Sequence, residues 1–169
     1  MTRLLGAAFL TAASVLAGFY AGARVKLKCE TLAQCTALTA FFASAISHSG
    51  ESLPVIVQRA CKSGSFNLLG FLETINNSDL SEGFGTVWGG SLEKTSACLD
   101  AQNKNLLKSF GARLGKTDAK DQVELCEFYK SRFEFNEAQL RKKCTEQVKL
   151  CRVAGAAVGV LLFVFLSGG

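Results

Sequence analysis

Two apolar segments without charged residues lie at the two ends of the chain, over 4–23 and 153–169. A helix of about twenty apolar residues is roughly 30 Å long, which matches the hydrocarbon core of a bilayer. We therefore expect an N-terminal transmembrane helix over 1–24 and a C-terminal transmembrane helix over 153–169. The second segment is near the lower length limit for a span, so a helix that lies against partner proteins is the alternative.

The middle of the chain, 25–152, has apolar residues at helical intervals and no sustained alternation, which predicts helices rather than strands. The expected helices cover 25–47 as a continuation of the first membrane helix, then 53–61, 66–75, 79–88, 92–114 and 117–153. Four glycines weaken the helix near 79–88. The predicted fold class is all-α: a small bundle of up-down helices flanked by the two transmembrane helices.

The last of these helices has a near-heptad apolar seam. Phe128 and Phe135 are expected to widen its apolar face. The seam consists of Cys126, Phe133, Leu140, Cys144, Val148 and Cys151. An antiparallel hairpin within one chain is the favoured interpretation, and an intermolecular coiled coil is the alternative. In both cases the helix continues without interruption into the C-terminal membrane segment.

The charges predict an orientation. All 14 acidic residues and 18 of the 19 basic residues lie between Arg24 and Arg152, and the net charge is +5. The basic residues next to the apolar segments are Arg24, Lys26, Lys28, Arg141, Lys142, Lys143, Lys149 and Arg152. Basic flanks remain in the cytoplasm and favour anionic lipids, so we expect a cytoplasmic middle domain on a lipid bilayer. A signal sequence cleaved after Ala23, leaving a secreted or surface-tethered helical binding module, is the alternative.

The residues offer little catalytic chemistry. Seven cysteines are irregularly spaced without a CxxC pair, and the one histidine, His48, lies in a polar break between expected helices. Most cysteines are therefore expected to be small buried residues in a reducing compartment, with a redox or metal-binding role as the alternative. The sequence contains no nucleophile elbow, phosphate-binding loop or HExxH motif. We expect no enzyme activity, cofactor, bound metal or nucleic-acid partner.

One stretch resembles a known family. Residues 106–118, LLKSFGARLGKTD, are similar to the FGxxLGxxD signature of the stage III sporulation protein AB family. The opening residues 3–7, Trp88 ahead of the signature, and the final apolar run agree with that family. Two features depart from it: Ala45 stands where the family has a glutamate, and 48–53 replaces a Tyr-Gly-x-Thr-Pro-Leu turn.

The resemblance implies an integral membrane protein of endospore-forming bacteria. It would be a non-enzymatic platform subunit of the mother-cell apparatus that forms a channel, or feeding tube, into the engulfed forespore. The soluble domain would be similar to the inner-membrane platform protein of type II secretion and type IV pilus systems. Implied partners are other sporulation channel membrane proteins and a cytoplasmic ATPase, with a homo-oligomer as a further option. The implied location is multi-pass in the mother-cell (outer forespore) membrane.

The residues that match the signature form the predicted structural or interaction site: Trp88, Phe110, Gly111, Leu114, Gly115 and Asp118. Gly111 and Gly115, four residues apart, would leave room for a crossing helix. Phe110 and Leu114 would fill the bundle core, Trp88 would lie partly in it, and Asp118 or Thr117 would cap the next helix. A structural role is favoured over direct contact with a partner.

Overall fold

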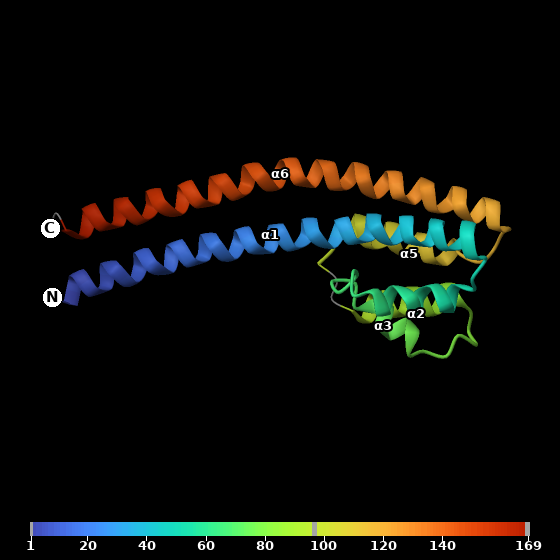
Figure 1. Cartoon of the computed structure of the whole chain (residues 1–169). Coiled ribbons are helices and arrows are strands. Elements are labelled where there is room, and N and C mark those ends of the chain that lie inside the picture. The colour runs from blue at the N-terminus through green and yellow to red at the C-terminus, as the bar shows by residue number, and fades with distance from the viewer. Residues whose placement is uncertain (1, 96–97, 168–169) are drawn as a thin grey trace. The chain divides into compact units, whose positions relative to one another are not determined.

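The computed structural model describes residues 2–95 and 98–167, and these residues form helices joined by turns, with no strand among them. The helices are α1 Thr2–Ser49, α2 Leu53–Ser63, α3 Phe71–Asn76, α4 Phe84–Lys94, α5 Ala101–Arg113 and α6 Ala119–Ser167 (Figure 1). The all-α prediction is confirmed.

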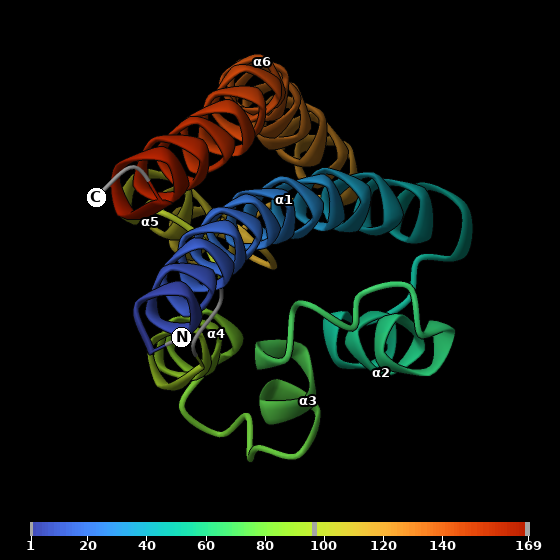
Figure 2. The ribbon, with the colours of Figure 1, turned by 90° about the vertical axis from the view of Figure 1, so that its left-hand side faces the viewer.

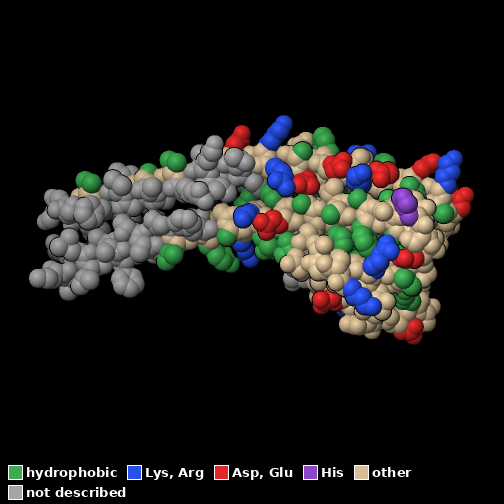
Figure 3. Space-filling view, viewed as in Figure 1, with side chains coloured by type: hydrophobic (Ala, Val, Ile, Leu, Met, Phe, Trp, Pro, Cys, Tyr) green, Lys and Arg blue, Asp and Glu red, His purple; other side chains and the backbone are tan. Residues whose placement is uncertain are grey.

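The chain divides into two units. The core unit is Glu30–Ala138, and the end unit combines Met1–Cys29 with Gln139–Gly169. In the core unit α3 packs against both α2 and α4, and α4 packs on α5 (Figure 2). Charged side chains of both signs are spread over the described surface of the core unit (Figure 3).

The core unit is built on the C-terminal half of α1. The helical stripe Leu32, Cys35, Leu38, Phe42 and Ile46 is buried, as its spacing predicts. Burying one large apolar side chain contributes about 1.5–3 kcal/mol. This stripe therefore makes α1 the helix around which the shorter helices are packed.

Among the residues described, one helical stretch, Gly22–Ser49, is long and apolar enough to cross a membrane. However, 56% of its most apolar window is buried inside the protein, with Leu38 and Phe42 fully enclosed. The core helix of a domain has the same length and composition, and all buried residues of this stretch except Cys29 belong to the core unit. The predicted spans over 1–24 and 153–169 are helical over 2–24 and 153–167, but most of their side chains lie outside the described part.

The expected helix over 66–75 is wrong in its first half, because the helix there begins only at Phe71. Residues 65–68 form a turn that is held by Gln34 of α1. The Gln34 side chain accepts a hydrogen bond from the Leu68 N–H at 2.9 Å and donates one to Asn67 at 2.7 Å. These tertiary hydrogen bonds replace the local helical ones.

The expected helices over 79–88 and 92–114 are also wrong in their bounds. α4 covers Phe84–Lys94, and α5 begins separately at Ala101. The break follows from Asp100, whose Oδ1 accepts a hydrogen bond from the Asn103 N–H at 2.8 Å and caps α5. Gly85 lies within α4 although glycine lowers helix propensity. Close packing explains the glycine, because a Cβ at this position would be only 3.1 Å from Ala112 Cα of α5.

The α6 seam faces the core of its own chain. Cys126 and Phe133 are fully buried, and the Phe110 ring of α5 lies 5.3 Å from the Tyr129 ring. The favoured interpretation, packing within one chain, holds for this part, whereas Cys144, Val148 and Cys151 have side chains outside the described part. Phe128 and Phe135 do not widen the buried face, because they are 49% and 62% exposed.

The cysteines differ from one another in the structure. Cys35 and Cys126 are free and buried, and burial raises the pKa of the Cys126 thiol to about 12, which makes it a poor nucleophile. Cys61 and Cys98 are free and half-buried. Cys29 is disulfide-bonded, so the expectation of reduced thiols is wrong for this residue.

His48 also differs from its predicted place. It lies in the last turn of α1 rather than in a loop, and it is exposed as expected. Its Nδ1 lies 3.1 Å from the Ser44 carbonyl oxygen and 2.8 Å from the Ser47 hydroxyl. Both contacts are local to the end of this helix.

Candidate interaction site at the turn between α5 and α6

The residues of the signature cover the end of α5, the following turn and the residue before α6. Asp118 caps α6, because its Oδ1 accepts a hydrogen bond from the Asp121 N–H at 2.9 Å. Gln122 closes the turn: its Oε1 accepts from the Gly115 N–H at 2.9 Å, and its Nε2 donates to Thr117 at 3.0 Å. Gln122 is buried and was missed at the sequence level, since one glutamine among charged residues carries no signal.

Gly115 has a backbone conformation that favours glycine. Its φ is +76°, in the left-handed region, and a Cβ there would lie 2.9 Å from Leu53 Cδ1. The neighbouring Leu114 is 3% exposed. The turn therefore packs on the first residue of α2. The space left by the missing side chain of Gly115 is taken by the side chain of Leu53 and not by the backbone of a crossing helix.

Gly111 lies directly under the indole of Trp88. A Cβ at position 111 would be 2.1 Å from Trp88 Cδ1 and Cγ, far inside van der Waals contact. Trp88 of α4 is fully buried, and its Nε1 donates a hydrogen bond to the Leu107 carbonyl oxygen at 2.9 Å. Trp88 is therefore fully part of the core and not only partly, and Gly111 is a position where the Trp88 side chain of α4 rests on α5.

An aromatic cluster surrounds this tryptophan. Its ring centroid lies 5.0 Å from Phe71, 5.6 Å from Phe84, 5.9 Å from Phe110 and 6.0 Å from Phe42. Most of these pairs are edge-to-face, an arrangement that contributes about 0.5–1.5 kcal/mol each beyond area burial. Phe42 and Phe71 were not in the predicted site, since nothing local connects helices so distant in sequence.

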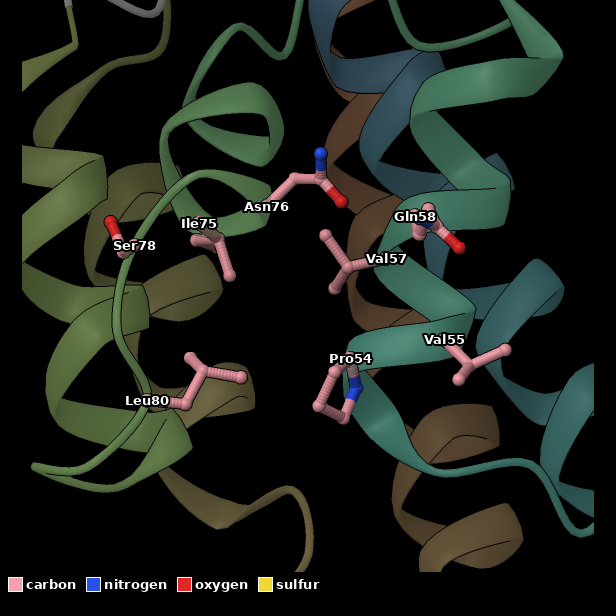
Figure 4. A pocket seen from close by; sticks show the side chains of 8 residues that line it. All are labelled: Pro54, Val55, Val57, Gln58, Ile75, Asn76, Ser78 and Leu80. Carbon is pink, nitrogen blue, oxygen red and sulfur yellow. The ribbon is translucent and has the colours of Figure 1, made fainter.

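A groove runs along the surface beside the turn. Its larger part has a volume of about 640 Å³ and is lined by Leu53, Pro54, Leu80, Gly83, Phe84, Gly85, Thr86, Ala112, Leu114, Gly115 and Lys116. Its smaller part has a volume of about 270 Å³, and there Pro54 and Val57 of α2 face Ile75 and Leu80 (Figure 4). The two parts share Pro54 and Leu80 and form one continuous surface, which we call the turn groove.

The chemistry of the turn groove suits binding. Lys116 is the one charged side chain among its described lining residues, and the rest are apolar, glycine or uncharged polar residues. Within the described part of the chain, no group of three or more His, Cys, Asp and Glu side chains could hold a metal ion. An apolar groove with one cation at its rim can hold an apolar segment that carries an acidic residue.

Together these features define an all-helical protein with an apolar surface groove beside a turn that is closed by specific contacts. Residues 3–167 match the model of the stage III sporulation protein AB family, and the chain belongs to this family. It is therefore a protein of stage III of sporulation, and the resemblance seen in the sequence is confirmed. No curated protein and no solved structure matches the chain.

Proposed function

We propose that this protein is a non-enzymatic assembly platform of the mother-cell sporulation channel. Family membership over 3–167 is the observation that carries the proposal. The apolar ends would anchor it as a multi-pass protein in the mother-cell (outer forespore) membrane, and the core unit would face the cytoplasm. Its role would be similar to that of the platform proteins of type II secretion and type IV pilus systems.

Charges support the proposed attachment to a bilayer. Arg24, Lys26 and Lys28 are exposed on α1, and Arg141, Lys142 and Lys143 are exposed on α6. Each basic residue near an anionic membrane surface contributes about 1 kcal/mol of attraction. Other membrane proteins of the channel would be its neighbours within that bilayer.

The turn groove is the proposed docking site of a cytoplasmic ATPase. Leu53, Leu80 and Phe84 give it an apolar lining, and Lys116 places one positive charge at its edge. An amphipathic segment of the ATPase that carries an acidic residue would bury its apolar side in the groove and pair with Lys116. The core of the protein would keep this surface in a constant shape.

Substitutions in the groove test the proposal. We expect Leu80→Asp to weaken capture of the ATPase by about tenfold or more, because an interface anchor is worth about 2 kcal/mol. We expect Lys116→Glu to act in the same direction with a smaller effect. The measurements are co-purification of the ATPase with the full-length protein and the yield of heat-resistant spores.

The matched control is Lys120→Glu. Lys120 is exposed in the first turn of α6 and does not line the turn groove. This variant should retain both the ATPase and the spore yield. Normal capture by a correctly folded Leu80→Asp variant would contradict docking at the groove.

The disulfide at Cys29 favours a second candidate function, a secreted or surface-tethered helical binding module. Disulfides persist mainly in oxidising compartments. This candidate requires removal of the N-terminal segment after Ala23, whereas the platform retains it. The intact mass of the protein purified from sporulating cells separates the two.

A further inference from the structure

α6 has an exposed stripe of aromatic and small residues on the side away from its buried residues. It consists of Phe128, Ser131, Phe135 and Ala138, at spacings of three, four and three residues, and all four are exposed. We call these residues the outer stripe. The alternating three and four spacing is the pattern by which one helix packs along another.

The outer stripe contributes no buried residue to the core unit, although the Phe128 ring lies 5.4 Å from the Tyr129 ring. The α6 residues that face the core are Gln122, Cys126, Tyr129 and Phe133, which are at most 4% exposed. Phe128 and Phe135, by contrast, are 49% and 62% exposed. Two large aromatic side chains one heptad apart on a solvated face indicate a surface that another molecule covers.

The charges beside the stripe are complementary to a second copy of the same helix. Glu127 precedes Phe128, and Arg132 follows five residues after Glu127. In parallel paired helices, residues at these two flanking positions meet across the interface, so Glu127 of each copy would pair with Arg132 of the other. One interface would contain this ion pair twice.

Present contacts of these residues allow the exchange. Glu127 pairs with Lys130 at 3.1 Å, and Arg132 lies 5.3 Å above the Phe128 ring, both at the surface. Surface ion pairs of this kind are worth little, so exchanging partners costs little. The Ser131 hydroxyl already donates a hydrogen bond to the Phe128 carbonyl oxygen at 2.8 Å. Its donor would therefore stay satisfied when an interface buries it.

We propose that two copies of this protein pair in parallel and in register through the outer stripe of α6. The parallel direction rests on the proposed function: α6 continues to Ser167, and both copies would enter the same membrane at that end. An antiparallel pair would direct the two C-terminal segments to opposite sides. Confinement to one membrane raises the effective concentration, so a seam of about two heptads can suffice.

The test uses the full-length protein in lipid vesicles, labelled at its N-terminus with a donor or an acceptor dye. Energy transfer between copies measures pairing as the protein-to-lipid ratio changes. We expect Phe128→Ser and Phe135→Ser each to weaken pairing by about tenfold. The control, Val55→Ser, changes another exposed apolar residue, 45% exposed on α2, and should leave pairing unchanged.

Charge exchange tests the register. Glu127→Arg should weaken pairing by several-fold, because it sets a second positive charge against Arg132 of the other copy. Adding Arg132→Glu to the same chain should restore pairing. Glu127 and Arg132 are not partners within one chain, because Glu127 pairs with Lys130 and Arg132 lies over Phe128. Effects on the stability of a single copy would therefore not explain restored pairing in the double variant.

Two outcomes would overturn the proposal. One is pairing that is absent, or equal in the wild type and the Phe128→Ser and Phe135→Ser variants. The other is loss of ATPase capture in those variants with pairing unchanged, which would assign the outer stripe to a different partner. Pairing as expected in a protein that fails to capture the ATPase would instead contradict the docking proposal alone.

Discussion

Replacing Gly111 with alanine should lower the free energy of unfolding by about 3 kcal/mol, the upper range for overpacking a core. The added Cβ would lie 2.1 Å from two indole atoms of Trp88 and 2.3 Å from Nε1. The indole cannot move aside easily, because four aromatic rings surround it and its N–H is bonded to Leu107. Chemical unfolding followed by fluorescence of Trp88, the one tryptophan of the chain, measures the loss.

Gly90→Ala is the matched control for this substitution. Gly90 lies in α4, the same helix as Trp88, and a Cβ there would have nothing within 4 Å. Alanine has the higher helix propensity, so this variant should gain up to about 1 kcal/mol. Equal stabilities of Gly111→Ala and Gly90→Ala would show that α4 and α5 do not meet as described.

Trp88→Ala should cost about 3–5 kcal/mol, as truncation of a buried large aromatic residue does. It removes the ring about which Phe42, Phe71, Phe84 and Phe110 are arranged, and with it the indole N–H that donates to the Leu107 carbonyl oxygen. Unfolding followed by far-ultraviolet circular dichroism measures this variant. The yield of heat-resistant spores should fall with the folded fraction.

The two substitutions should be strongly coupled. In the Trp88→Ala background the atoms that obstruct a Cβ at position 111 are gone, so adding Gly111→Ala should cost little or even stabilise α5. Trp88→Phe separates the ring from the N–H, since it retains an aromatic ring and loses the bond to Leu107. Costs of Trp88→Ala and Gly111→Ala that simply add would contradict direct contact between these residues.

Local patterns were sufficient for much of this fold. The buried stripe Leu32 to Ile46 follows from helical spacing, the cap at Asp118 from its side chain, and the turn at Gly115 from its freedom to adopt positive φ. Each of these depends on residues within a few positions of one another. The family signature also lies in one continuous stretch, which is why the sequence alone was enough to recognise it.

Residues distant in sequence decided the remainder. Residues 65–68 form a turn and not the helix predicted from their apolar spacing, because Gln34 of α1 bonds to the Leu68 N–H. Position 85 in α4 is occupied by glycine because a side chain there would crowd Ala112 of α5. Periodicity at Phe128 and Phe135 showed apolar character but not the side on which the core would form. That side depended on where α5 packed.

The helical class, the family and the residues of the predicted site could therefore all be read from the amino-acid sequence. Three features became visible only in the folded chain: Trp88 rests on Gly111, the signature turn borders the turn groove, and the outer stripe is exposed. The physical reason is range: capping, helix propensity and turn geometry act along neighbouring residues, whereas close packing joins side chains that only the folded chain brings together.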